Sequence, residues 1–256
     1  MAFTVGAFDE DRASAVTTLA TLDYVDDDHI HGVSDDLFVP ELNQLIGVYV
    51  FHGYQTEGNP TGCRIVSPNL RANWPLDIPK MHRPSENPSD FHVEMFPQDP
   101  LPLVAGESLN ALMTNGAVIN ARGIVGVFFA GAAIAPIHGL IRPILFTSVL
   151  TGVANAWTSG PLTPAQDLPV GRYQIVGARV VDAGVFGLFR FILTGFTWRP
   201  GGVITQYVRY QEVEWFRRGK LGVWGEFRQD SPPRLEVLAA YAASNPDVYL
   251  DLIKVA

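Results

Sequence analysis

The chain has 256 residues, of which 47% are hydrophobic and 17% are charged, against about 25% charged in an average soluble domain. This composition and length exclude a disordered polypeptide and a small disulfide-stapled scaffold. The formal net charge of −8 excludes the basic surface of a typical nucleic-acid-binding protein. Residues 1–141 carry 6 basic and 17 acidic residues, whereas residues 142–256 carry 12 and 9. We interpret this as two differently solvated surfaces, although halves of opposite sign could also help copies dock side by side.

Cysteine usage and the N-terminal sequence bear on the compartment. Cys63 is the single cysteine, which excludes an intrachain disulfide and a cysteine-based zinc cluster. The first residues, MAFTVGAFDEDRASAV, carry acids where a secretion signal needs basic residues and an apolar run. We therefore expect no secretion signal.

Runs rich in valine, isoleucine, threonine and aromatic residues predict strands, because these residue types favour extended structure and turn-forming residues bound the runs. In chain order the runs are 44–54, 62–67, 117–130, 144–153, 172–181, 185–194 and 203–216. Strands do not alternate with long helices, which argues against a parallel α/β sheet. The predicted class is mainly β.

Two short helices are also predicted, over 103–113 and 232–244. In the second, Leu235, Leu238 and Ala242 share one helical face, two prolines open the segment and Asn245-Pro246 closes it.

Two proline-containing segments predict irregular structure. Residues 69–90 contain several prolines and show no periodicity, which predicts a long loop that carries function or contacts a neighbour. Pro200-Gly201-Gly202 fits a type II turn, in which proline presets φ and glycine accepts a positive φ.

The uncharged stretch 123–141, flanked by Arg122 and Arg142, has the length of a membrane-spanning helix. Its glycines, Pro136 and the β-branched start favour a strand followed by a turn, since buried strands also form continuous apolar runs. A membrane-associated protein remains an alternative.

The two halves of the chain resemble each other. Residues 46–53 match 170–177 at an offset of 124 through Gly47/Gly171, Tyr49/Tyr173 and Gly53/Gly177. Residues 96–102 match 227–233 at an offset of 131 through Phe96/Phe227, Gln98/Gln229, Asp99/Asp230 and Pro102/Pro233. In each half the second match is followed by a predicted helix and an apolar strand, and a weaker match pairs 12–22 with 142–152. These features predict an internal duplication, with domains at 1–135 and 136–256.

His29-Ile30-His31 followed by Asp35 and Asp36 is the one pattern reminiscent of a metal-binding β-barrel of the cupin type. It follows a run of aspartates instead of a glycine-led strand, and His138 is the only histidine after residue 92. We favour solvated loop histidines over a metal site.

Other candidate chemistry is weak. Calcium favours several oxygen ligands, and the acids Asp23, Asp26, Asp27, Asp28, Asp35 and Asp36 could supply them, but their spacing favours an exposed acidic turn. Ser108 lacks a nucleophile-elbow context and is interpreted as an ordinary serine. Paired carboxylates for glycoside hydrolysis leave no local spacing to find. The aromatic and basic residues of 198–218 favour strand packing or a subunit contact over base stacking.

The duplicated units 44–130 and 168–256 resemble the double jelly-roll major capsid proteins of tailless icosahedral viruses, the lineage of adenovirus hexon and membrane-containing bacteriophages. The resemblance rests on DLPVGRYQIVGARV (167–180), the WRPGG segment (198–202) and LGVWGEF with PPRLEVL (221–238). It implies two consecutive antiparallel jelly-roll sandwiches, each with a short helix before its last strand.

The same resemblance implies a structural virion protein with no active site, cofactor or metal. Three copies would form a pseudo-hexameric homotrimer through heterologous contacts, drawing on Trp74, Trp198, Trp215 and Trp224. Expected partners are further copies, other capsid proteins such as a vertex protein and an underlying membrane, with no direct contact to nucleic acid. The alternative is a two-domain cupin-like enzyme or carbohydrate-binding protein.

Overall fold

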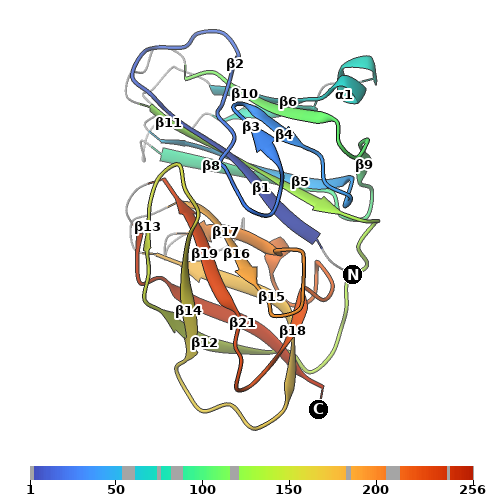
Figure 1. Cartoon of the computed structure of the whole chain (residues 1–256), viewed down its shortest axis with the longest axis vertical. Coiled ribbons are helices and arrows are strands. Elements are labelled where there is room, and N and C mark those ends of the chain that lie inside the picture. Colours follow the sequence, from blue (N-terminus) through green and yellow to red (C-terminus); the bar gives the residue numbers. More distant parts are fainter. Residues whose placement is uncertain are drawn as a thin grey trace.

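The first half of the chain forms two facing antiparallel sheets in the computed structural model, which describes residues 3–53, 61–73, 76–81, 89–115, 121–182, 186–205, 214–240 and 243–255 (Figure 1). One sheet has the order β1-β11-β5-β8, with β9 paired to β5; the strands are β1 (Phe3–Arg12), β11 (Ala121–Ala130), β5 (Gln44–Gly53), β8 (Ser89–Met95) and β9 (Leu101–Pro102). The other has the order β3-β4-β10-β6-β7, with β2 paired to β10; the strands are β3 (Gly32–Val33), β4 (Asp36–Phe38), β10 (Ser108–Met113), β6 (Thr61–Val66), β7 (Leu76–Met81) and β2 (Ala20–Thr21).

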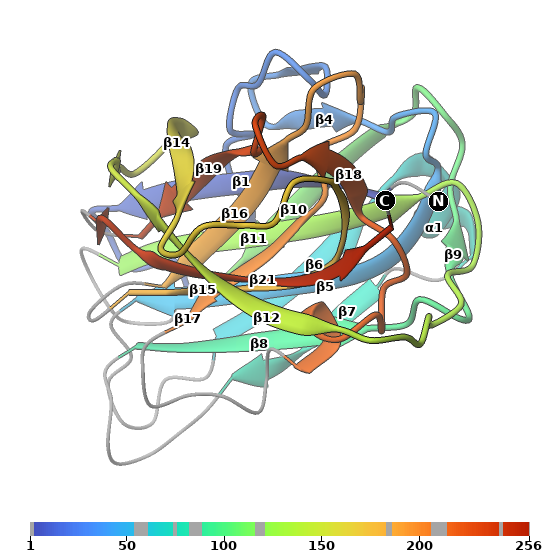
Figure 2. The same cartoon turned by 90° about the horizontal axis from the view of Figure 1, so that it is seen from below.

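The second half forms one strongly curved sheet of order β17-β16-β19-β14-β12-β21-β15-β18, in which β15 also pairs with β17. Its strands are β12 (Arg142–Ser148), β14 (Thr158–Pro164), β15 (Arg172–Val181), β16 (Gly187–Ile192), β17 (Gly201–Thr205), β18 (Gly225–Arg228), β19 (Arg234–Ala239) and β21 (Asp247–Lys254). A separate pair joins β13 (Thr151–Gly152) to β20 (Ala243–Ser244). Figure 2, seen from below, looks along the stack of sheets, with the second half lying over the first.

The two halves repeat the same strand order. Taken along the chain, β1, β4, β5, β6, β7, β8, β10 and β11 correspond to β12, β14, β15, β16, β17, β18, β19 and β21. The path β1-β11-β5-β8 then corresponds to β12-β21-β15-β18, and β4-β10-β6-β7 corresponds to β14-β19-β16-β17. The matched sequence segments lie near corresponding strands: 46–53 lies in β5 and 170–177 runs into β15, which are the third strands, whereas 96–102 begins directly after β8 and 227–233 begins in the last two residues of β18, so that both cover the turn after the sixth strand. The weaker match of 12–22 with 142–152 does not, because only 142–152 contains the first strand of its half.

The sheet β1-β11-β5-β8 is buried on both faces. Ile124 and Phe128 of β11 pack toward the second half, whereas Val125 and Val127 pack into the core of the first half. Burial on both faces explains the continuous apolar sequence here. Residues 123–141 are therefore most of β11 and the connection that follows it, not a helix. No helix in the described segments is long and apolar enough to cross a bilayer.

Aromatic contacts join the two halves into a shared core. The ring of Phe3 lies edge-on to Trp224 with centroids 5.1 Å apart, and Phe128 lies 5.3 Å from Phe216. Leu188 of β16 approaches the backbone at Gly126 so closely that a Cβ there would lie 2.8 Å from it. One cluster of buried hydrophobic side chains consequently runs from β1 to β21 across the junction.

The prediction of a short helix before each last strand is wrong. Residues 108–113 form β10 and residues 234–239 form β19, which are the seventh strands of their halves. In β19 all residues from Leu235 to Ala239 are buried, because one face meets the second-half core and the other meets the first half. A short apolar run buried on both faces has no periodicity that separates strand from helix.

The predicted long loop 69–90 contains two regular elements: the helix α1 (Pro68–Asn73) and the strand β7. The strand is compatible with Pro79 because β7 lies at the edge of its sheet, where a missing N–H costs no ladder hydrogen bond. Part of the predicted strand 203–216 is the 3-10 turn η1 (Glu214–Phe216), while 206–213 lie outside the described residues.

The predicted type II turn at Pro200-Gly201-Gly202 is also wrong. Both glycines belong to β17, and neither has a positive φ. Glycine is needed here for close approach, since a Cβ on Gly201 would lie 1.9 Å from the carbonyl oxygen of Phe189 on the neighbouring strand.

Candidate functional site at the junction of the two halves

The acidic segment 23–36 lies against the junction of the two halves. The N–H of Val25 donates to the carbonyl of Ala7 at 2.9 Å, so the segment runs along the free edge of β1. The side chain of Ile30 is buried in the first-half core. Held at these points, the turn between them reaches Arg190 of β16 and Arg199, which lies just before β17.

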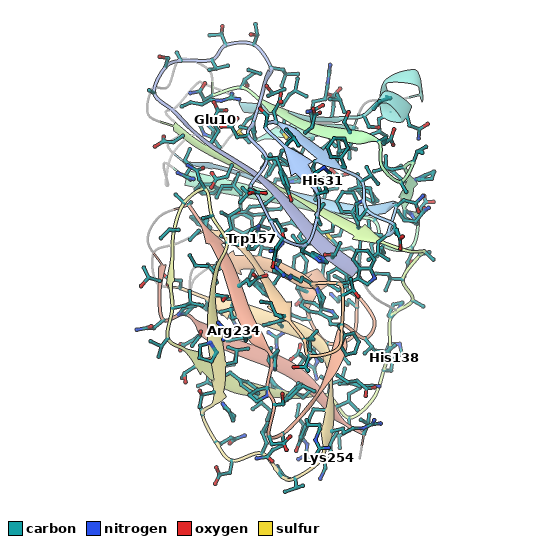
Figure 3. The ribbon with its side chains drawn as sticks, viewed as in Figure 1. Glu10, His31, His138, Trp157, Arg234 and Lys254 are labelled. Atoms are coloured by element: carbon teal, nitrogen blue, oxygen red, sulfur yellow. The ribbon has the colours of Figure 1, made fainter. Side chains whose placement is uncertain are left out.

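Asp27 forms an ion pair with Arg190 across the junction, and both side chains are almost fully removed from water. Arg190 Nε also donates to Glu236 Oε2 at 2.6 Å, and its guanidinium lies 4.0 Å from the centre of the Trp157 ring. Figure 3 shows Trp157 between the two halves. Arg190 thus meets carboxylates from both halves and an aromatic face, which offset the cost of removing its charge from water.

Arg199 supplies a second cation to the same place. Its guanidinium lies 3.0 Å from Glu236, 3.7 Å from Asp27 and 2.7 Å from Asp28. The side chain of Asp28 is 80% exposed, so its pair contributes little. The other four residues, Asp27, Arg190, Arg199 and Glu236, are called the junction cluster below. Aspartates of the acidic first half therefore pair with arginines of the second half within one chain.

The interpretation of the acidic segment as an exposed turn is correct for Asp26 and Asp28 but wrong for Asp27, whose carboxylate is enclosed by the two arginines. The Asp36 carboxylate lies elsewhere and accepts a hydrogen bond from Asn110 Nδ2 at 2.9 Å. In the described ranges, no three histidine, cysteine, aspartate or glutamate side chains gather as a metal site.

The histidine pair is split between two surroundings. His29 Nε2 lies 2.7 Å from Thr4 Oγ1, and its ring lies edge-on to Trp198 with centroids 5.6 Å apart. The exposed ring of His31 stacks on Phe38 at 5.0 Å. The two imidazoles do not form a common ligand pair.

Burial lowers the pKa of His29 to about 4, with Asp27 opposing this shift and Arg190 and Arg199 adding to it. The imidazole is therefore neutral at physiological pH. It adds no third positive charge beside the two arginines of the junction cluster.

A second buried ion pair lies at another point of the junction. Arg122 Nη2 donates to Asp9 Oδ2 at 2.5 Å and to Asn155 Oδ1 at 2.8 Å, and the N–H of Asn155 donates to Asp9 Oδ2 at 2.8 Å. Asn155 adopts a left-handed conformation with φ of 56°, which asparagine tolerates better than most residues. Burial raises the pKa of Asp9 although Arg122 acts in the opposite direction.

The remaining candidate residues lie apart from the junction. Cys63 is buried on β6, and burial raises the pKa of its thiol to about 12. Ser108 is the first residue of β10. His138 is exposed on the connection between the halves (Figure 3).

Of the tryptophans expected at subunit contacts, Trp224 is only 1% exposed and packs among Phe3, Phe189 and Phe191, so it is part of the core. Trp215 is 39% exposed. Trp74 lies outside the described residues.

No family model and no curated protein matches this sequence. Among solved structures, the chain is weakly similar to the major capsid protein P2 of bacteriophage PM2, at 10% identity and a TM-score of 0.25 over 99% of this chain and 98% of that one. It is equally weakly similar to the PBSX exported protein XepA, at 7% identity and a TM-score of 0.25 over 96% and 86%. Likeness at this level carries no argument about function.

Sequence reasoning did not find Arg190 and Glu236, although a signal is present. Each is a lone charged residue inside an otherwise apolar stretch, GLFRFIL and LEVLAA. A charge in a strand that is buried on both faces must find an opposite charge. That rule identifies both residues as members of an ion-pair cluster, but it does not name the partners.

Proposed function

We propose that this chain is a structural virion protein: a major capsid subunit with two consecutive jelly rolls, 1–135 and 136–256. The supporting observation is the strand order, which runs 1-8-3-6 on one side and 2-7-4-5 on the other in both halves when each half's corresponding strands are numbered along the chain. Eight strands in two four-stranded layers is the arrangement of a jelly roll; in the second half the pairing of β12 with β14 joins the two layers into one sheet.

The junction supports a subunit that acts as one block. The shared hydrophobic core and the junction cluster fix the two halves against each other, so their relative orientation is preserved when copies associate. Three such blocks around an axis present six similar units and give a nearly hexagonal outline. A threefold ring closes through two different patches on each copy.

The proposal includes the partners and the place of action. The partners are further copies of the chain, other capsid proteins such as a vertex protein, and an underlying membrane. The net charge of −8 is unfavourable for direct packing against nucleic acid. The chain acts in the virion after synthesis in the host cytoplasm, without catalysis and without a cofactor.

The cupin-like alternative loses its strongest sequence feature. Its histidines, His29 and His31, contact Thr4 and Phe38 respectively and do not converge. No other observation favours this alternative.

Native mass measured over a concentration series tests the proposal. We expect a trimer of 84.0 kDa, three times the chain mass of 28.0 kDa, or larger shells, and a hexagonal outline in negative-stain electron microscopy. A chain that stays monomeric up to millimolar concentration and binds a divalent metal at one equivalent would overturn it.

A further inference from the structure

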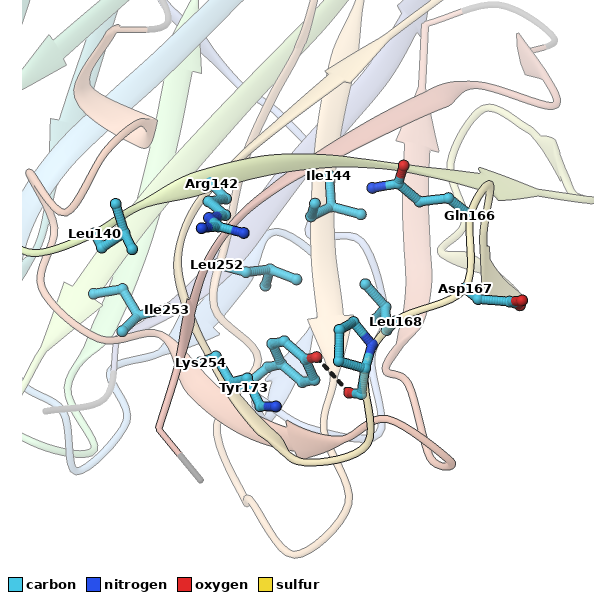
Figure 4. A pocket seen from close by; sticks show the side chains of 11 residues that line it. Leu140, Arg142, Ile144, Gln166, Asp167, Leu168, Tyr173, Leu252, Ile253 and Lys254 are labelled. Atoms are coloured by element: carbon cyan, nitrogen blue, oxygen red, sulfur yellow. Dashed lines mark hydrogen bonds between the residues drawn. The ribbon is translucent and has the colours of Figure 1, made fainter.

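A pocket of about 340 Å³ opens at the end of the second half that lies farthest from the first half (Figures 3 and 4). Residues of β12, β15 and β21 and of the connection 165–171 line it. Ligand pockets for small molecules occupy about 300–1,000 Å³, so this one lies at the small end of the range. We name it the barrel-end pocket.

The walls of the barrel-end pocket are mainly apolar, and the polar residues of its lining are Arg142, Gln166, Asp167 and Lys254. Asp167 is exposed, and its carboxylate points away from Tyr173 in Figure 4. Leu168, Tyr173 and Leu252 are each at most 7% exposed, and Ile144 and Pro169 complete the surface between them. The Tyr173 hydroxyl donates to the carbonyl of Pro169 at 2.5 Å, drawn as a dashed line in Figure 4. Because its one hydroxyl proton is already donated, the tyrosine offers the pocket its ring and no free hydrogen-bond donor.

Two cations stand at the mouth. Arg142 pairs with Leu252, and Lys254 pairs with Tyr173; since paired residues share one face of a sheet, both cations lie on the side of the pocket. Both are exposed. Among the described residues, neither has a carboxylate within 4 Å, whereas the nearby Arg228 lies 3.2 Å from Asp230.

The surroundings of the mouth are apolar as well. Leu140, which lines the pocket, is 74% exposed, and Val170, next to the lining residue Pro169, is 85% exposed. An apolar cavity, an apolar mouth and two cations that pair with no carboxylate of the described residues complement one chemical class: a single alkyl chain that carries an anionic headgroup.

We propose that the barrel-end pocket binds a fatty carboxylate, with the alkyl chain between Ile144, Leu168 and Leu252 and the carboxylate beside Arg142 and Lys254. The site is independent of the capsid proposal, because it depends on one chain alone. Its failure would leave the native-mass test untouched.

Titration calorimetry with octanoate, nonanoate and decanoate, each below its micelle concentration, tests the proposal. Each added methylene should tighten binding by about fourfold while the chain still fits, since one buried methylene contributes a roughly constant free energy. Decan-1-ol, which has the same chain and no charge, should bind more weakly than decanoate. Absence of saturable binding, or equal affinity for alcohol and carboxylate, would overturn the assignment.

Variants separate the two parts of the site. The exposed pair R142Q/K254Q should bring decanoate to the affinity of decan-1-ol and leave the chain-length dependence intact. Ile144→Phe should fill the pocket and abolish binding, whereas Leu145→Phe, the matched control on the opposite face of β12, should bind as the unmodified chain does. Equal binding by Ile144→Phe and Leu145→Phe would contradict the proposal without relying on the folding of one variant.

Flotation with phosphatidylglycerol vesicles distinguishes a free amphiphile from a bilayer surface. We expect Ile144→Phe to leave any vesicle binding unchanged, because the pocket accepts one chain and not a bilayer surface. Vesicle binding that Ile144→Phe abolishes would overturn the free carboxylate as the ligand of the pocket.

Discussion

The Asp27 carboxylate and the Arg190 guanidinium, 163 positions apart in the chain, form an ion pair with side-chain exposures of 0% and 1%. Each residue comes from a different half. A buried pair of this kind adds little net stability against an apolar alternative, but the loss of one partner leaves the other charged and without water. The pair therefore makes the stability of the whole chain depend on the correct docking of its halves.

Arg190→Met is expected to lower the free energy of unfolding by about 3–5 kcal/mol, because Asp27 and Glu236 then remain buried without their main cation. Urea denaturation at fixed protein concentration measures this. Arg234→Met is the control on the adjacent strand, since Arg234 is exposed and contacts only Ser159 Oγ among described side chains.

The carboxylate side of the pair gives a second control. Asp27→Asn should destabilise far more than Asp26→Asn, although the residues are adjacent and equally charged, because only Asp27 is enclosed. Equal effects of the two substitutions, or a loss below about 1 kcal/mol for Arg190→Met, would show that the cluster does not hold the halves.

Phe186→Ala tests whether the halves share one core. The Phe186 ring lies 5.3 Å from both Phe51 and Phe91 of the first half, and its removal should cost about 3–5 kcal/mol. Differential scanning calorimetry should show one transition for the unmodified chain and one, at lower temperature, for the variant. Phe196→Ala, at a position 44% exposed, should leave the transition in place. Two separate transitions in the unmodified chain would argue for independent halves.

The β class and the duplicated order of the halves were predictable because both depend on local signals. The Gly-x-Tyr segments around Tyr49 and Tyr173 lie in or at the start of the third strands, and the Phe-x-Gln-Asp segments lie where the sixth strands end and turn. The turn residues that follow also repeat between the halves, so a comparison of the sequence with itself at a fixed offset is enough to detect the duplication.

The junction could not be predicted from the sequence, because its partners are brought together only by tertiary packing. The sequence predicts a helix over Leu235 to Ala239, since burial on both faces removes the alternation that identifies a strand. Likewise, Asp26, Asp27 and Asp28 are indistinguishable as residue types, and only their distances to Arg190 and Arg199 separate them.

Acid sensitivity is expected from His52. Its side chain is 1% exposed, and burial, with Arg12 nearby, lowers its pKa from 6.5 to about 4. Between these pH values the unfolded chain binds a proton that the folded chain does not, so the free energy of unfolding falls as pH drops, by about 3 kcal/mol in total.

His52→Phe should remove the share of His52 and leave the similar share that His29 contributes, so its stability should fall about half as steeply, and urea denaturation at pH 7, 6 and 5 measures the difference between the two proteins. Exposed His138 provides the control, since His138→Gln should follow the unmodified chain at every pH. Parallel stability profiles for His52→Phe and the unmodified chain would contradict the assignment.

Gly201→Ala separates two explanations for the same glycine. A Cβ at this position would lie 1.9 Å from the carbonyl oxygen of Phe189, so the strands must shift and the free energy of unfolding should fall by about 1–3 kcal/mol. Gly131→Ala is the control, because its Cβ would meet only Leu42 at 3.4 Å.

Gly201→Asn decides between close approach and a positive-φ turn. Asparagine tolerates a left-handed conformation better than alanine does, whereas at a close strand contact its larger side chain should make it at least as destabilising as alanine. Higher stability for Gly201→Asn than for Gly201→Ala would restore the turn and remove the strand contact as the reason for glycine.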